Sequence, residues 1–508
     1  MKTSTLGRRA LLKVAGFGAA AAAFGACHDD DDNPTKIGEV LDASPSTWDE
    51  LRRKLRGDLV LPGDARYDTV RRAHNTLFDT QLPAAVAECV APSDVQACIE
   101  AARRNEVRVA ARSGGHSFGG YSTAPGSLVV DLHRLSNVVI DSPDTVIVAA
   151  GAQLIDVYAK LAEAGRCLPS GSCATVGISG ITLGGGLGAL TRKYGLTCDA
   201  LLSADIVLAD GSRRTVSPRA DEDLYWALRG GGGGNFGIVT SFTFRTQPAP
   251  PVLTVFGVSF PRGSAVDVLG AWQFWYAAVP KELWSNCIVS GGAGNPAGIY
   301  VGGCFVGSAS DLAPHIDNLI QRAGVQPSSR SATEKGYMDT MMYFAGCPTL
   351  TVEQCHLRGE SDAGGGQLDR ATFVGSSRVI AQWADSQKVA DVMRDQVTLN
   401  LLIDGLGGAV QNLAPHATAF PHRQALATVQ VYRGATAENR AESEQAVAHV
   451  QSALVDAVGF GAYVNYIDPR MADWGQAYYG ANLARLQQVA KVYDADKFFD
   501  FPQSIHRT

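Results

Sequence analysis

The stretch RSGGHSFGG, residues 112–120, sets His116 among four glycines, behind an arginine and a serine. Glycine lets the backbone adopt positive φ and approach a ligand closely, and exposed amides beside a cation suit the binding of an anion. His116 would then touch the group that the loop holds. A surface turn with a capping histidine is the simpler alternative, and this stretch alone does not decide between the two.

Two further glycine clusters favour a ligand site. Residues 171–199 read GSCATVGISGITLGGGLGALTRKYGLTCD, and residues 229–244 read RGGGGGNFGIVTSFTF. Such a density of glycine implies backbone that runs close to a large flat or phosphorylated ligand. The clusters contain neither the Gly-Lys-Ser/Thr of a P-loop nor the spacing of the dinucleotide fingerprint. Together, the three ordered clusters predict a site for a large cofactor.

The elements around these clusters predict two kinds of sheet. Between about residues 82 and 244, short β-rich runs alternate with helical stretches, which indicates a domain built by β-α crossovers. The proline-rich stretch 248–251 marks a boundary. From 252 to about 466, longer strand-like runs and long helices indicate an α+β domain with an antiparallel sheet backed by helices.

Length and charge set broad limits. The chain has 508 residues, which suits two or more domains. Its formal net charge of -6 includes no basic excess, so nothing points to nucleic acid as a partner.

The first 34 residues predict export. Arg8 and Arg9 precede an apolar, alanine-rich run that lacks acidic residues, as in a twin-arginine signal. FGAC, ending at Cys27, resembles a lipobox, so acylation of Cys27 would provide the one expected link to a membrane. An ordinary signal with an incidental cysteine is the alternative. Residues 28–34, HDDDDNP, then form a solvated tether.

The cysteines leave several pairings open. The chain has ten, and no CxxC pair or CxxCH occurs, so we expect no metal site and no covalent haem. Cys347 with Cys355 and Cys89 with Cys98 are the nearest in sequence, but sequence alone does not fix connectivity.

Six ordered stretches resemble the berberine-bridge-enzyme-like branch of the vanillyl-alcohol-oxidase flavoproteins. They are RSGGHS, SGSCATVGISGITLGGGLG with RKYGLTCD, LRGGGGGNFGIVTSF, AFPHR from Ala419, YVNY from Tyr463 and FFDFPQSI from Phe498. The resemblance is collinear from about residue 62 to the end. It implies an α+β fold in which a PCMH-type FAD-binding domain of two subdomains joins a substrate domain with an antiparallel sheet backed by helices.

The resemblance also implies a division of the chain. We expect a signal peptide and tether at 1–34, an FAD-binding domain at 35–250 with its PCMH-type core at about 82–250, and a substrate-binding domain at 251–466. Residues 467–508 would form a C-terminal segment that returns to the FAD-binding domain.

Covalent FAD is the central implication. In the family, the histidine of RSGGH is joined to the flavin 8α-methyl group and the cysteine of the next cluster to flavin C6, which corresponds here to His116 and Cys173. An imidazole nitrogen and a thiolate are both nucleophiles that can attack an electrophilic flavin carbon. A packed core cysteine is the alternative for Cys173.

The remaining cofactor contacts follow from the same motifs. The pyrophosphate would contact Arg112, Ser113, Gly114, Gly115 and Ser117. The flavin and ribityl chain would lie along Thr175, Val176, Gly177, Gly180, Gly185 and Gly186. The adenosine end would contact Gly233, Gly237 and Val239, and Asn465 is a further expected cofactor contact.

For catalysis, the resemblance implies a tyrosine base that takes the proton of a substrate hydroxyl. Tyr463 matches that tyrosine, with Tyr466 as the alternative if the register differs. A free phenol titrates near pH 10, so it needs help, and Asp404 stands where relatives that oxidise oligosaccharides carry an aspartate. Tyr194 of RKYG matches a pocket tyrosine of relatives that oxidise alcohols, with a core aromatic as the equal alternative.

Two positions narrow the reaction. Gln430 replaces the catalytic glutamate of the alkaloid-cyclising enzyme, which favours plain alcohol oxidation. Val176 occupies the position that gates oxygen in the family, where valine is typical of oxidases.

The sequence therefore predicts an exported FAD-dependent oxidase whose small-molecule substrate is a sugar, oligosaccharide or aromatic alcohol, and whose acceptor is dioxygen, giving hydrogen peroxide. Oxidation of a polyketide or alkaloid is the alternative reaction. A flavin-bearing electron carrier without efficient turnover is a second alternative. A hydrolase is disfavoured because no GxSxG elbow occurs.

Overall fold

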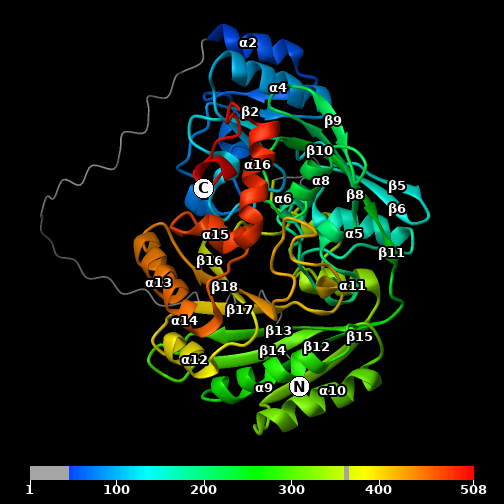
Figure 1. Cartoon of the computed structure of the whole chain (residues 1–508), viewed down its shortest axis with the longest axis vertical. Helices are drawn as coiled ribbons and strands as arrows, with labels where there is room; N and C mark the ends of the chain where they lie inside the picture. The colour runs from blue at the N-terminus through cyan, green and yellow to red at the C-terminus, as the bar shows by residue number, and fades with distance from the viewer. Residues whose placement is uncertain (1–44, 360–364) are drawn as a thin grey trace, which may run out of the picture.

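Two small sheets stand beside one large sheet in the computed structural model, which describes residues 45–359 and 365–508 (Figure 1). The N-terminal half forms the small sheets, and the following residues form the large one. The mixture of parallel and antiparallel sheets with separate helical layers makes this an α+β protein.

The first small sheet has the order β1-β2-β4-β3. Strands β2 (Ala85–Glu88), β4 (Leu128–Asp131) and β3 (Val109–Arg112) are parallel, and β1 (Asp58–Val60) pairs antiparallel with β2. Helix α4 (Pro92–Arg104) connects β2 to β3, and α2 (Pro45–Lys54) packs beside α4. All residues of β2 and β4 are buried, as is usual for a parallel sheet that is covered on both faces.

The second small sheet is antiparallel, with the order β5-β6-β10-β8-β9. Its strands are β5 (Val138–Ser142), β6 (Thr145–Ala149), β10 (Ile238–Arg245), β8 (Leu201–Val207) and β9 (Arg213–Val216). Helices α5 (Leu154–Glu163) and α8 (Glu222–Ala227) share one apolar core with both small sheets. Strands β7 (Arg166–Cys167) and β11 (Gln247–Pro248) form a separate pair.

The large sheet has seven antiparallel strands in the order β15-β12-β14-β13-β17-β18-β16. They are β15 (Ser329–Lys335), β12 (Leu253–Ser259), β14 (Gly298–Phe305), β13 (Leu283–Ser290), β17 (Leu399–Gly405), β18 (Ala427–Gly434) and β16 (Phe373–Ile380). Asp404 of β17 and Gln430 of β18 line a cavity, whereas other residues of these strands join an apolar core: Leu399, Leu401, Ile403, Ala427, Val429 and Val431. Period-two alternation thus places Asp404 and Gln430 on the face opposite this core, here called the polar face.

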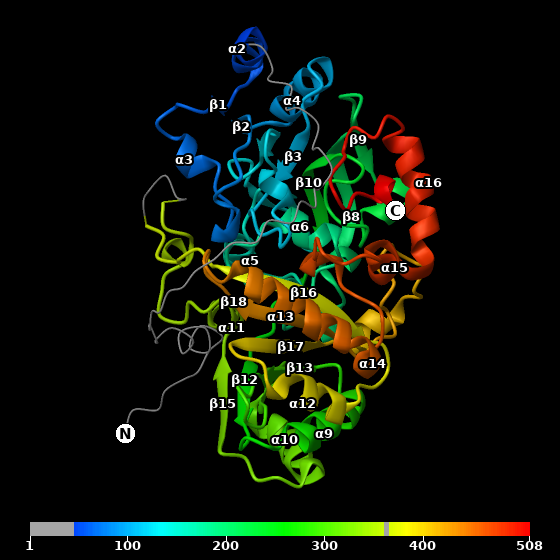
Figure 2. The same ribbon diagram turned by 90° about the vertical axis from the view of Figure 1, so that its left-hand side faces the viewer.

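Helices cover the apolar face of the large sheet (Figures 1 and 2). They are α9 (Ala265–Ala278), α10 (Ala309–Ala323), α12 (Ser386–Arg394), α13 (Arg440–Ala453) and α14 (Val455–Val458). The face that carries Asp404 and Gln430 is therefore left toward the small sheets.

The C-terminal residues return to the small sheets. After η6 (Val464–Tyr466) come helices α15 (Trp474–Tyr479) and α16 (Leu483–Tyr493), and α16 packs beside α8 (Figure 1). Leu486 of α16 joins the core of the small sheets, and the Ile505 amide donates to Asn235 Oδ1 at 2.9 Å. The chain end thus fixes the third glycine cluster.

Shorter helices complete the fold. They are α3 (Tyr67–Val70), η1 (Thr76–Phe78), η2 (Tyr121–Thr123), α6 (Ile178–Leu183), α7 (Thr191–Tyr194), η3 (Thr197–Asp199), α11 (Tyr337–Phe344), η4 (Glu353–Cys355), η5 (Gly408–Asn412), η7 (Gly480–Asn482) and η8 (Ile505–Arg507).

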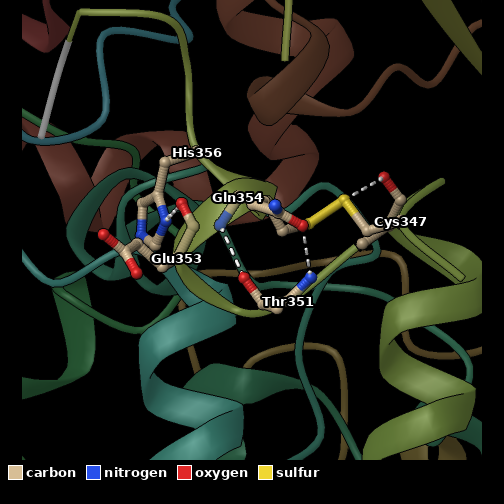
Figure 3. The surroundings of a disulfide bond; sticks show 7 residues. Cys347, Thr351, Glu353, Gln354 and His356 are labelled. Atoms are coloured by element: carbon tan, nitrogen blue, oxygen red, sulfur yellow. Dashed lines mark hydrogen bonds between the residues drawn. A yellow bond between two sulfur atoms is a disulfide. The ribbon is translucent and has the colours of Figure 1, made fainter. Parts of the chain in front are cut away.

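A disulfide joins Cys347 to Cys355 in the segment between α11 and β16 (Figure 3). Backbone and side chain of Thr351 both hydrogen-bond Gln354 within the closed loop, and His356 Nε2 contacts Asp156 of α5 at 3.1 Å. In the structure Cys89 and Cys98 are free thiols.

The predicted signal, with Arg8, Arg9 and Cys27, lies outside the described residues, so export and acylation stay predictions. Within 45–359 and 365–508, no helix combines the length and the apolar character needed to cross a bilayer. The predicted domain boundaries also stay predictions.

Candidate active site

A cavity of about 360 Å³ lies between the glycine loops of the small sheets and the polar face of the large sheet. All three glycine clusters line it, and so do the YVNY stretch and the C-terminal residues 499–503. Residues separated by several hundred positions therefore converge on one site.

His116 lies in the loop that follows β3 and lines the cavity. Its Nε2 atom is 2.8 Å from Thr175 Oγ1, so Nδ1 is the ring nitrogen left for a further bond. Burial, with His74 beside it, holds the pKa of His116 well below its usual value. The ring is therefore neutral at physiological pH, which keeps a nitrogen lone pair available.

Cys173 lies in the loop between β7 and α6, is exposed, and lines the same cavity. Its neighbour Ala174 packs into a small apolar cluster with the disulfide Cys347–Cys355. The exposure of Cys173 argues against a packed core cysteine.

One edge of the Arg112 guanidinium is already paired within the protein. Its Nη2 atom donates to Asp131 Oδ2 at 2.6 Å and to the Val70 carbonyl, and both charged side chains are buried. Burial alone would raise the pKa of Asp131, but the charges of Arg112 and His133 hold it well below its usual range. The guanidinium is therefore already neutralised, although Arg112 remains part of the cavity wall.

The glycines let the loops approach one another closely and leave their backbone open to the cavity. A Cβ on Gly114 would lie 2.3 Å from the amide nitrogen of Gly177, so the first two glycine loops touch backbone to backbone. Gly180 and Gly233 line the cavity, and a Cβ on Gly180 would meet no atom within 4 Å. Glycine thus leaves room for a ligand to lie against the main chain.

Most of the expected cofactor contacts line this cavity. They are Arg112, Ser113, Gly114, Gly115, Ser117, Val176, Gly177, Gly180, Gly233, Gly237, Val239 and Asn465. Thr175, Gly185 and Gly186 do not line it. Thr175 instead fixes His116, and Gly186 donates its amide to Tyr463.

Tyr466, the alternative to Tyr463, makes a hydrogen bond with Asp404. Tyr466 Oη lies 3.5 Å from Asp404 Oδ2. Tyr463 Oη accepts hydrogen bonds from the Gly186 amide at 2.9 Å and from Asn465 Nδ2 at 2.8 Å. Burial raises the pKa of Tyr463. Tyr463 thus anchors the second glycine loop through its phenol, and the catalytic roles of Tyr463 and Tyr466 stay predictions.

Gln430 and Trp284 extend the polar wall around this pair. Gln430 is 7% exposed and lines the cavity from β18. Trp284 lines it from β13, and its indole Nε1 donates to the Gly405 carbonyl at 3.1 Å. The sequence analysis missed Trp284, because it reaches the cavity only through the pairing of β13 with β17, in which Asn286, two residues after Trp284, stands opposite Asp404.

Tyr194 is not among the lining residues of the described chain. It packs partly buried against the core of the small sheets, with Lys193 Nζ 5.6 Å from its ring centroid. Burial raises the pKa of Tyr194 to about 12. These contacts match the alternative of a core aromatic.

The comparisons with known proteins identify an FAD-binding family. The family described as FAD binding domain matches residues 83–217, and the family described as berberine and berberine like matches residues 462–506. The uncharacterized FAD-linked oxidoreductase YgaK of Bacillus subtilis is 30% identical, over 89% of this chain and 98% of YgaK. The chain belongs to the berberine-bridge-enzyme-like family.

Several of the similar proteins are carbohydrate oxidases. The xylooligosaccharide oxidase of Thermothelomyces thermophilus is 30% identical, over 88% of this chain and 92% of its own. The structure of the glucooligosaccharide oxidase of Acremonium strictum, described with a 6-S-cysteinyl, 8α-N1-histidyl FAD, has a TM-score of 0.80 at 27% identity, over 89% and 97% of the two chains. The protein is therefore an FAD-dependent oxidase with a PCMH-type fold.

The residues present fit FAD on two observations. The backbone of the glycine loops is open to the cavity at Gly180 and Gly233, as a flat ring system and its chain require. Arg112 Nη1 is buried without a hydrogen-bond partner among the described residues, which leaves one donor at the cavity wall. The cavity is also lined by residues that the sequence analysis did not single out, namely Phe118, Tyr121, Asn235 and Tyr479.

Proposed function

We propose that this oxidase acts on a hydroxyl group of a neutral sugar or oligosaccharide, with FAD attached through His116 and Cys173 and dioxygen as acceptor. One observation carries the proposal: the Asp404–Tyr466 pair lies in the cavity that His116 and Cys173 also line. Nucleophiles for attachment and a phenol with a carboxylate partner thus share one site.

The two attachment residues suit their chemistry. His116 is neutral and has one ring nitrogen engaged with Thr175, while Cys173 is exposed to the cavity. They lie on different loops, so two bonds would hold the cofactor from two directions. Attachment at both edges of the ring system would leave a ring face open to a bulky substrate.

The catalytic step follows from the same geometry. Bound FAD supplies the acceptor for the hydride that leaves the substrate carbon. Tyr466 takes the hydroxyl proton, and the Asp404 carboxylate 3.5 Å away accepts or orients the phenol proton. Gln430 can donate to and accept from a neighbouring substrate hydroxyl.

The charge of the cavity supports a neutral substrate. The part of the wall that the large sheet contributes consists of Trp284, Asp404 and Gln430, with no cation among its described residues. The lining cations, Arg108 and Arg112, belong to the small-sheet side. A substrate carboxylate near Tyr466 would be repelled by the Asp404 carboxylate. Sugar hydroxyls, in contrast, can form hydrogen bonds with the Gln430 amide and the Asp404 carboxylate.

Dioxygen as acceptor rests on Val176. This residue lies in the same loop as Cys173 and lines the cavity, so a longer aliphatic side chain at this position would reach further into it. Hydrogen peroxide is then the second product.

The proposal is tested by acid precipitation and proteolysis of the purified protein. Added flavin mass on the peptides containing His116 and Cys173, followed by peroxide release with neutral mono- and oligosaccharides, would support it. Free flavin in the supernatant would refute the attachment. Peroxide release with aromatic alcohols or polyketides, but with no carbohydrate, would refute the substrate class.

A further inference from the structure

His74 lies flat against His116. The two ring centroids are 3.8 Å apart and the planes meet at 14°. His74 belongs to the loop between α3 and η1, and its Nδ1 atom is buried without a hydrogen-bond partner in the described part of the chain. A buried imidazole that gives up a hydrogen bond to stack on another imidazole needs an explanation.

The backbone holds His74 from two sides. Its amide donates to the Gly115 carbonyl at 3.0 Å, and its carbonyl accepts from the Ala371 amide at 3.1 Å. Because Gly115 immediately precedes His116, this hydrogen bond joins the two backbone segments that bear the stacked rings. Ala371 precedes β16 of the large sheet, so His74 is fixed to both halves of the molecule.

Arg370 strengthens this arrangement. Its guanidinium donates to the Ala73 carbonyl, with Nε at 2.8 Å, and pairs with Asp79, with Nη1 at 2.8 Å from Oδ2. Burial, with the nearby charge of Arg370, lowers the pKa of His74 to about 4. His74 is therefore a neutral flat ring, and its stacking brings no positive charge next to the His116 ring.

The two contacts of His116 fix its ring in complementary ways. Thr175 holds the Nε2 edge, and His74 covers one face. Rotation about either side-chain torsion would break one of these contacts. The Nδ1 atom of His116 therefore keeps one direction at the cavity wall.

We propose that His74 is a positioning residue for the formation of the His116–flavin bond, an inference that rests on the proposed function. The bond joins His116 Nδ1 to the flavin 8α-carbon. The imidazole would give up its N–H proton and the 8α-methyl group one C–H bond, so that two protons and two electrons in total would pass to the flavin ring. Dioxygen then takes the two electrons and two protons as hydrogen peroxide, which restores oxidised, linked flavin.

The test uses full-length protein with Cys173→Ala, so that acid-stable flavin reports the His116 bond alone. Into this background we place His74→Phe, which keeps a flat stacking ring, and His74→Leu, which fills space without one. His356→Gln, at a histidine that contacts Asp156 outside the cavity, is the matched control. Acid-stable flavin per protein, total flavin and melting temperature are measured for each.

We expect His74→Leu to lower the linked fraction or its rate of formation at least about tenfold, because a misplaced nucleophile loses that much or more. His74→Phe and His356→Gln should stay near the Cys173→Ala parent. Equal linkage in His74→Leu and the parent would overturn the inference. A parent without acid-stable flavin would instead refute the proposed attachment at His116.

A second measurement separates positioning from general damage. With Cys173 restored, His74→Leu should lose flavin mass on the His116 peptide and keep it on the Cys173 peptide. Equal loss on both peptides would mean that His74 only supports the fold, and it would overturn the inference.

Discussion

Tyr466 Oη lies 3.5 Å from the Asp404 carboxylate, whereas Tyr463, only three residues earlier, turns its phenol to the Gly186 amide and Asn465. One short stretch thus supplies two tyrosines with different hydrogen-bond partners, and we propose different tasks for them. Tyr466 faces a proton acceptor in the cavity, and Tyr463 ties the second glycine loop to the C-terminal part of the chain.

The first prediction separates these tasks. Tyr466→Phe should lower kcat/KM by about 10²- to 10⁴-fold, the usual contribution of a general base, with little change in melting temperature. Tyr463→Phe should keep most activity and lose about 1–3 kcal/mol of stability, because it leaves buried donors without an acceptor. Steady-state kinetics and denaturant unfolding of both variants check this. A larger kinetic loss in Tyr463→Phe would return the role of base to Tyr463.

The second prediction concerns the carboxylate. Asp404→Asn keeps the shape of the side chain but removes the charge that takes or orients the Tyr466 proton. We expect kcat to fall by about 10² or more while linked flavin is unchanged. Asp369→Asn, at an exposed carboxylate paired with Arg358, is the control. An Asp404→Asn enzyme with wild-type kcat would show that Tyr466 works without this partner.

Much of the site could be predicted from the sequence because it is built from contiguous glycine loops. The loops that carry His116 and Cys173 line one cavity as expected. On β17 and β18, alternation alone places Asp404 and Gln430 on the polar face. The family motifs also indicated that the chain end returns to these loops.

The rest depended on contacts between distant residues. The Tyr463 backbone exchanges hydrogen bonds with Ser377 Oγ of β16, and this long-range contact holds the backbone of the stretch that carries both tyrosines. Arg112 stands opposite Asp131 in the parallel register of β3 and β4, which commits its charge. Neither pairing leaves a signal in the local sequence.

The third prediction tests the oxygen acceptor. Val176→Leu adds one methylene at the cavity wall, a change worth about tenfold or more where space is limiting. We expect peroxide production to fall by that factor while turnover with a soluble two-electron dye remains. Stopped-flow reoxidation of reduced enzyme with oxygen measures the step directly. An unchanged rate would mean that oxygen reaches the flavin by another path.

The fourth prediction concerns acid stability. Burial lowers the pKa of His74 and of His422 to about 4, so the folded protein binds fewer protons than the unfolded chain between pH 4 and 6.5. Stability is therefore lost as the pH falls through this window, by about 2 kcal/mol per histidine between pH 7 and pH 5.

In His74→Phe, the free energy of unfolding should fall by about 2 kcal/mol less between pH 7 and pH 5, because the contribution of His74 is gone. His356 has the opposite sign, because its hydrogen bond to Asp156 raises its pKa, and His356→Gln should make the acid loss steeper. Unfolding free energies at pH 7 and pH 5 measure both slopes. An unchanged slope in His74→Phe would show that His74 is not held neutral in the fold.

The last prediction concerns the disulfide Cys347–Cys355, which closes a short loop in the cluster that contains Ala174. A bond across 8 residues of sequence should stabilise the fold by about 2.5 kcal/mol through the entropy of the unfolded chain. The double change Cys347→Ser and Cys355→Ser should lose this amount in denaturant unfolding. Because Ala174 adjoins Cys173, we also expect less flavin on the Cys173 peptide, with the His116 peptide unaffected. Full linkage at Cys173 in the double variant would show that the cluster does not support that loop.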